Sequence, residues 1–218
     1  FRATILKACD HAESQHSIVT LGINPTRPDT GYGYIEFEPG DESGIRKVKS
    51  FREKPNVEDA RRYLTAGNFV WNAGIFIWRL DNILDAYKMY ASGIYNILNK
   101  GIGIYNTDRE LEFIQKEYPR TEKISVDYAI LEKANNVYTI PCDIGWSDLG
   151  TWTSLYEQLP KDESGNAILG KPVFTEDTKH SLILSQNSRL IVIKGLEDYI
   201  IVDTDDCLII YPKSDEQS

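Results

Sequence analysis

Four short segments hold the polar and glycine residues of this sequence that could carry chemistry. They are residues 28–34, 51–55, 69–78 and 143–152. Each adjoins a predicted strand, and open α/β sheets bind their ligands beyond the ends of their strands. The spacing therefore predicts a small-molecule site built from several segments.

The first two segments suit a sugar or a phosphate. The glycine Gly33 allows the backbone to approach a ligand closely, although a tight turn that needs glycine explains the same residues. Lys54 offers a compact positive charge for a phosphate, and the adjacent Glu53 can accept hydrogen bonds from sugar hydroxyls. A solvated Glu–Lys pair on the surface is the alternative.

The other two segments each contain one polar side chain in a special setting. Asn72 is flanked by apolar residues at a buried strand, so its amide needs partners from the backbone or from a ligand. Asp148 lies between a predicted strand and a helix, where it either caps the helix or binds Mg²⁺. The residue types alone leave both pairs of alternatives open.

Composition narrows the class of protein. The chain has 218 residues, of which 41% are hydrophobic, so it can bury a core. With 33 acidic and 24 basic residues the net charge is −9, which argues against binding nucleic acid or a membrane surface. We find no apolar signal core and no stretch long enough to span a bilayer, and expect a cytoplasmic protein. No Walker loop, Rossmann GxGxxG, GxSxG or HExxH motif occurs.

The elements predicted from periodicity change in character along the chain. Up to residue 159 strands alternate with helices, which indicates an α/β fold with a mostly parallel sheet. These strands cover 17–23, 32–37, 45–51, 74–78, 136–140 and 143–146, and the helices cover 55–67, 81–101, 107–119 and 125–134. From residue 160 to 218 we expect a small all-β domain with strands at 167–169, 181–184, 190–193, 199–202 and 208–211.

Five motifs in order resemble the mannose-1-phosphate guanylyltransferases of the sugar nucleotidyltransferase superfamily. They are GYGYIEF, FREKP, FVWNAGIFIW, SVDYAILEK and DIGWSDLGTW. The resemblance covers the whole chain and corresponds to the C-terminal part of these enzymes. It implies a partial Rossmann-like nucleotidyltransferase domain over residues 1–159 and a left-handed β-helix-like appendage over residues 160–218.

The resemblance also implies a function and a set of site residues. The family transfers GMP from GTP to mannose 1-phosphate, which gives GDP-mannose and pyrophosphate. The resemblance implies that Glu53 and Lys54 contact the sugar phosphate, and that Lys54 and Asp148 are catalytic. The matching positions Gly33, Asn72 and Gly74 would line the sugar pocket, with Asp148 as the ligand of Mg²⁺.

Three expectations are less specific. The family's glycine-rich nucleotide loop is not found between Phe1 and Ser218, and the chain starts within a helical pattern, so we expect an inactive fragment of a longer enzyme. A sugar-phosphate-binding fragment with another sugar or base specificity is the alternative function. The motif gives Asp127 no assigned role, and the apolar C-terminal strands allow a homodimer.

Overall fold

The computed structural model describes residues 1–40, 43–170 and 172–216. The chain divides into two compact units, Phe1–Trp146 and Ser147–Ser218. This division lies earlier in the chain than the domain boundary that the sequence predicted after residue 159. The boundary after residue 159 stays a prediction. The remaining positions, 41–42, 171 and 217–218, fall within the two predicted domains and lie outside the described residues. In the described ranges, no helix has both the length and the apolar character needed to cross a membrane.

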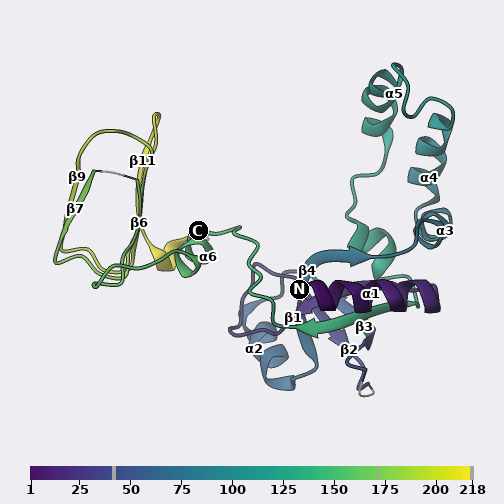
Figure 1. Ribbon diagram of the computed structural model, residues 1–218, viewed down its shortest axis with the longest axis horizontal. Coiled ribbons are helices and arrows are strands. Elements are labelled where there is room, and N and C mark those ends of the chain that lie inside the picture. The colour runs from purple at the N-terminus through teal and green to yellow at the C-terminus, as the bar shows by residue number, and fades with distance from the viewer. Residues whose placement is uncertain (41–42, 171, 217–218) are drawn as a thin grey trace. The chain divides into compact units, whose positions relative to one another are not determined.

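Among its described residues, the first unit contains five strands and most of the helices (Figure 1). Its strands are β1 (Ile18–Ile23), β2 (Tyr34–Phe37), β3 (Arg46–Arg52), β4 (Phe69–Ile77) and β5 (Val137–Cys142). Its α-helices are α1 (Arg2–Gln15), α2 (Val57–Ala66), α3 (Leu80–Tyr90), α4 (Ser92–Leu98) and α5 (Glu110–Glu117), followed by the π-helix η3 (Asp127–Leu131). Two short 3-10 helices are η1 (Asn99–Gly101) and η2 (Tyr118–Arg120).

Local sequence signals explain where helix α2 begins and ends. The side chain of Asn56 accepts a hydrogen bond from the backbone N–H of Asp59 at 2.8 Å, which caps the first turn. Gly67 ends the helix with φ of 74°, a left-handed conformation that glycine adopts without strain. The predicted helix over 81–101 is instead interrupted at Ala91, and the predicted strand at 143–146 is not formed.

The five strands form a sheet that closes on itself in the order β1-β4-β2-β3-β5. Only β1 and β5 are parallel in this sheet, and the other four pairs are antiparallel. The predicted mostly parallel sheet is therefore wrong. The reason for this error is that β4 lies between β1 and β2 and runs antiparallel to both. The alternation of helices and strands along the sequence therefore did not determine the direction of the strands.

Two apolar clusters fix this sheet against its helices. One packs Ala8 and Ala12 of α1 and Ala60 of α2 against strand residues such as Leu21 and Trp71. Figure 1 shows α1 lying alongside strands of this sheet. The second cluster packs α3 and η3 against residues that include Ile18, Ile35 and Val70. Because neighbouring strand residues point in opposite directions, Trp71 enters the first cluster and Val70 the second.

The described part of the second unit contains helix α6 (Trp152–Gln158), the short η4 (Lys213–Asp215) and six strands in two small sheets. The strands are β6 (Ala167–Leu169), β7 (Val173–Glu176), β8 (Leu182–Ser185), β9 (Ile191–Lys194), β10 (Tyr199–Asp203) and β11 (Leu208–Pro212). Strands β6, β8 and β10 are parallel in one sheet, and β7 and β9 are parallel in the other. Strand β11 closes the larger sheet by antiparallel pairing with β10. The small C-terminal β sheets are thus confirmed, although β7 was not predicted. The left-handed sense of the coil stays a prediction.

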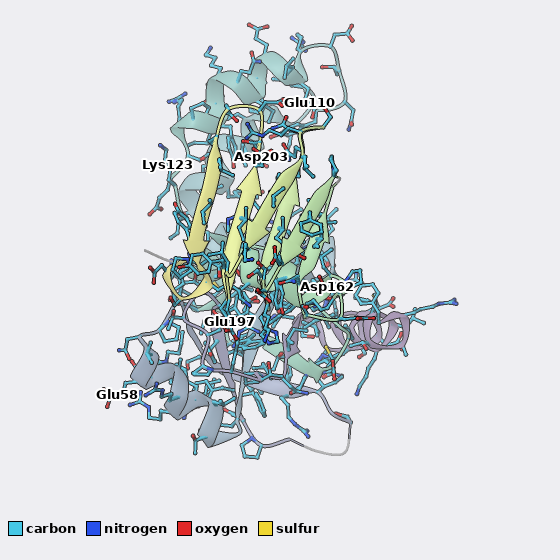
Figure 2. The ribbon with its side chains drawn as sticks, turned by 90° about the vertical axis from the view of Figure 1, so that its left-hand side faces the viewer. Glu58, Glu110, Lys123, Asp162, Glu197 and Asp203 are labelled. Atoms are coloured by element: carbon cyan, nitrogen blue, oxygen red, sulfur yellow. The ribbon has the colours of Figure 1, made fainter. Side chains whose placement is uncertain are left out.

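Two buried polar side chains hold the turns between these strands. Asn166 is 1% exposed, and its amide donates to the carbonyl of Thr178 at 2.8 Å and accepts from the N–H of Ser181 at 3.1 Å. Asp203, labelled in Figure 2, is fully buried at the end of β10 and accepts hydrogen bonds from Arg189. These hydrogen bonds lower the pKa of the Asp203 carboxyl.

Candidate functional site: a polar pocket on the five-stranded sheet

Strands β2 and β4 bring Gly33 and Asn72 side by side. The backbone N–H of Asn72 donates to the carbonyl of Gly33 at 2.8 Å. A Cβ atom on Gly33 would lie 2.7 Å from Oε2 of Glu53 and 3.6 Å from Cβ of Asn72. Glycine at position 33 therefore leaves the space that the Glu53 carboxylate occupies.

These three residues line a small pocket in the first unit. Its walls are Gly33, Tyr34, Phe51, Arg52, Glu53, Asn72, Asp127, Tyr128 and Glu132. The structure thus brings together three of the residues that the sequence proposed for sugar binding, from segments far apart in the chain. Their role as sugar contacts stays a prediction.

Lys54 and Gly74 lie next to the pocket in sequence but do not line it. Lys54 is exposed and has φ of 40°, a left-handed conformation that side chains other than glycine adopt at a cost. Gly74 has φ of 67°, and its N–H donates to Oδ1 of Asn72 at 3.1 Å. Position 74 therefore favours glycine for its backbone conformation, and it also anchors the amide of Asn72.

The π-helix η3 supplies one wall of the pocket. Its defining hydrogen bond joins the N–H of Glu132 to the carbonyl of Asp127 at 2.9 Å. Short π-helical turns are rare and are often found at functional sites. The sequence indicated an ordinary helix here and gave Tyr128 and Glu132 no role. Their position in the SVDYAILEK motif is the only sequence signal that pointed to them.

The pocket is rich in hydrogen-bond acceptors. Glu53, Asp127 and Glu132 contribute carboxylates, whereas Arg52 is the basic side chain among the lining residues. Burial raises the pKa of the Tyr128 phenol, and the negative charges of these three carboxylates raise it further. The phenol therefore stays protonated at neutral pH and remains able to donate. The carboxylates and the amide that line this small pocket can hydrogen-bond to a hydroxyl group.

Asp148 belongs to the second unit. It is exposed, and its Oδ1 accepts from the N–H of Gly150 at 2.9 Å. The side chain of Thr151 caps α6 by accepting from the N–H of Ser154 at 3.1 Å. The cap alternative for Asp148 is therefore wrong, because Thr151 occupies that position.

A single exposed carboxylate fits one mode of Mg²⁺ binding. Magnesium typically uses one or two carboxylates together with substrate phosphates and water. No group of three or more His, Cys, Asp or Glu residues in the described part of the chain could hold a metal ion. The carboxylate of Asp148 is the type of donor that magnesium uses, and magnesium binding remains a prediction.

Comparison with known proteins places the chain in a family. The model of the family described as "Nucleotidyl transferase" matches residues 1–165, well over half of the chain. The chain belongs to the nucleotidyl transferase family.

Particular relatives sharpen the comparison. The chain is 36% identical over 212 residues to mannose-1-phosphate guanylyltransferase 2 of Escherichia coli O157:H7, covering 94% of this chain and 44% of that protein. It is 35% identical over 217 residues to mannose-1-phosphate guanylyltransferase of Escherichia coli strain K12, covering 96% and 44%. The resemblance seen in the sequence motifs is thereby confirmed. The chain spans less than half the length of these curated relatives.

A solved structure gives the same result for the fold. The crystal structure named mannose-1-phosphate geranyltransferase, from Thermus thermophilus, matches with a TM-score of 0.85 and 25% sequence identity. The match covers 98% of this chain and 61% of that chain. The mixed α/β fold with small C-terminal sheets is therefore a nucleotidyltransferase fold.

Proposed function

We propose that this chain forms the sugar-phosphate side of the active site in an enzyme that transfers GMP from GTP to mannose 1-phosphate. The products are GDP-mannose and pyrophosphate. The observation that supports this function best is the pocket in which Gly33, Glu53 and Asn72 meet. The similarity to mannose-1-phosphate guanylyltransferases supports the choice of mannose as the sugar and guanine as the base.

The pocket residues have complementary roles in this proposal. Glu53 accepts hydrogen bonds from sugar hydroxyls, and its carboxylate is given room by Gly33. The amide nitrogen of Asn72 donates a hydrogen bond to the sugar, and the amide oxygen accepts one from the N–H of Gly74. Lys54 follows Glu53 directly, and its ammonium group offsets the negative charge of the sugar phosphate.

The proposed reaction is a direct displacement. A phosphate oxygen of mannose 1-phosphate attacks the α-phosphorus of GTP and forms a new P–O bond. The bond from the α-phosphorus to the bridging oxygen breaks, and pyrophosphate leaves with that electron pair. Since both reactants are anions, this chain contributes positioning of the sugar and neutralisation of charge.

Asp148 would hold Mg²⁺ in this enzyme through its carboxylate. When bound, the ion would screen phosphate charge and help to orient the phosphates. Asp148 is an exposed residue whose Oδ1 accepts a hydrogen bond from the N–H of Gly150, and its exposure supports this proposed role.

Pyrophosphate release tests this function. The assay contains mannose 1-phosphate, Mg²⁺ and each nucleoside triphosphate in turn, with the 218-residue chain and with a protein that carries it at the length of its relatives. We expect turnover with GTP by the longer protein. Turnover with another nucleotide alone, or with none, would contradict the proposal.

Two variants of the longer protein test the assigned residues against charge-matched controls. Lys54→Ala and Asp148→Asn are expected to abolish most of the turnover while preserving the circular dichroism spectrum. Lys116→Ala and Glu163→Gln change exposed side chains of the same charges elsewhere, and are expected to leave the rate unchanged. An unchanged rate in either site variant would remove that residue from the mechanism.

A further inference from the structure

The ring of Tyr32 lies at the centre of an aromatic cluster in the first unit. Tyr32 is 7% exposed, and its ring contacts Trp71 edge to face with 5.0 Å between the ring centroids. The guanidinium group of Arg27 lies over both rings, and its Nε donates a hydrogen bond to Asp29 at 3.0 Å. Tyr32 therefore has a fixed place on the sheet, directly before Gly33 in the chain.

Trp146 packs onto this cluster from the segment that leads to Asp148. Its ring lies edge to face against Tyr32, with 5.5 Å between the ring centroids and 66° between the ring planes. Residues 143–151, all of which the structure describes, form no helix or strand. Trp146 and Ile144 instead attach this segment to the apolar cluster of the first unit. The attachment of the segment therefore depends on its apolar side chains.

Asp148 follows Trp146 by two positions and belongs to a turn with a defined backbone. Two residues span at most about 7 Å, so the Cα atom of Asp148 cannot lie farther than this from the Cα atom of Trp146. The N–H of Leu149 donates to Oγ of Ser147 at 3.2 Å, and the N–H of Gly150 donates to Oδ1 of Asp148 at 2.9 Å. Leu149 has φ of 51°, a left-handed conformation that persists only where the surrounding groups enforce it. The turn thus has one conformation, and the ring of Trp146 holds its beginning.

We propose that Trp146 is a positioning residue for Asp148. The contact of its ring with Tyr32 restricts where the Asp148 carboxylate can lie. Less conformational entropy is then lost when the carboxylate and phosphate oxygens meet around one ion. This inference rests on the proposed function, in which Asp148 holds Mg²⁺, and it adds a residue that acts through Asp148.

Binding of Mn²⁺ tests the inference without depending on turnover. Mn²⁺ replaces Mg²⁺ because its electron paramagnetic resonance signal reports the free ion, and it is titrated into the longer protein saturated with GDP-mannose. The variants are Trp146→Ala, Trp146→Phe, Asp148→Asn and the control Trp78→Ala. Trp78 is a matched control, because it is also a half-buried tryptophan of the first unit and its ring stacks on Phe76. Calorimetry measures the affinity of each variant for GDP-mannose without metal, and circular dichroism measures its thermal midpoint.

We expect Trp146→Ala to weaken Mn²⁺ binding roughly tenfold to hundredfold, the usual effect of losing the support behind a metal ligand. The affinity of this variant for GDP-mannose without metal should stay unchanged. Trp146→Phe should retain most of the Mn²⁺ affinity, because it keeps a ring against Tyr32. Trp78→Ala should lower the thermal midpoint as Trp146→Ala does, yet leave Mn²⁺ binding unchanged. If Trp146→Ala fails to fold, Trp146→Leu replaces it, because leucine keeps apolar volume and removes the ring.

The outcomes separate this inference from the proposed function. Weaker Mn²⁺ binding in Asp148→Asn, with undiminished binding in Trp146→Ala, would overturn the role of Trp146 and leave the proposed function standing. A loss of Mn²⁺ affinity in Trp78→Ala as large as that in Trp146→Ala would overturn it as well, because lower stability would then explain both losses. Undiminished Mn²⁺ binding in Asp148→Asn would instead contradict the proposed magnesium site, and this inference with it.

Discussion

Replacing Gly33 by alanine places one methyl group where the Glu53 carboxylate now lies. The new Cβ atom would be 2.7 Å from Oε2 of Glu53, closer than carbon and oxygen normally approach without a bond, and 3.6 Å from Cβ of Asn72, an ordinary contact. The Glu53 side chain is exposed and flexible, so it can rotate away. The perturbation is therefore confined to one proposed sugar contact.

The expected effects on folding and on binding differ greatly. Moving an exposed side chain costs little, and alanine also reduces the entropy of the unfolded chain, so the free energy of unfolding should change by less than about 1 kcal/mol. Loss of a hydrogen bond from a sugar hydroxyl to the Glu53 carboxylate costs about 1.5–3 kcal/mol. Affinity for mannose 1-phosphate should then fall roughly tenfold to hundredfold.

Calorimetric titration and urea unfolding measure the two effects. Gly93→Ala is the matched control, because a Cβ atom there meets nothing within 4 Å and the residue lies in α4. A double-mutant cycle adds Glu53→Ala alone and combined with Gly33→Ala. If Gly33 acts through Glu53, the two losses should not add. Full additivity, or unchanged affinity in Gly33→Ala, would refute the reasoning.

Three further predictions concern Lys54 and the C-terminal unit. Because φ at Lys54 is 40°, Lys54→Gly should be about 1 kcal/mol more stable than Lys54→Ala in urea unfolding. Both variants should lose affinity for mannose 1-phosphate equally. Unequal affinities would mean that the backbone conformation, and not the ammonium group, determines binding. Asn166→Ala leaves the buried N–H of Ser181 without its acceptor and should lower the free energy of unfolding by about 1–3 kcal/mol, so a loss below about 0.5 kcal/mol would contradict the role of this turn. Arg189 lowers the pKa of Asp203, so the carboxylate stabilises the fold above the unfolded value of about 4 and this contribution is lost as the pH falls through the folded pKa. Asp203→Asn should flatten the pH dependence of the free energy of unfolding in this acidic range. An unchanged pH dependence would contradict the contribution of the Asp203 carboxylate.

The elements that were predicted correctly depend on nearby residues. Helix α2 is bounded by the cap at Asn56 and the left-handed glycine at Gly67, both of which are local signals. The short strands of the C-terminal unit follow from their β-branched residues in the same way. Strand direction was predicted wrongly, because the alternation of strands with helices favours parallel pairing, whereas β4 pairs antiparallel with both β1 and β2.

The candidate site also depends on contacts between residues far apart in the sequence, which local signals do not show. The EKP and WNAG motifs identified Glu53 and Asn72, but their meeting around Gly33 depends on the pairing of β2 with β4. The hydrogen bond from Asn72 to Asp127 joins residues 55 positions apart, so no local pattern indicates it. The cap at Thr151 was missed for another reason. Asp148 and Thr151 are both good capping residues, and only the backbone shows which one the helix uses.

A crystal structure of the chain with mannose 1-phosphate tests the central claim most directly. Our account predicts the sugar in the pocket between Gly33, Glu53, Asn72 and Asp127, with the phosphate group next to the ammonium group of Lys54. A sugar phosphate bound elsewhere on the chain, with this pocket empty, would contradict it.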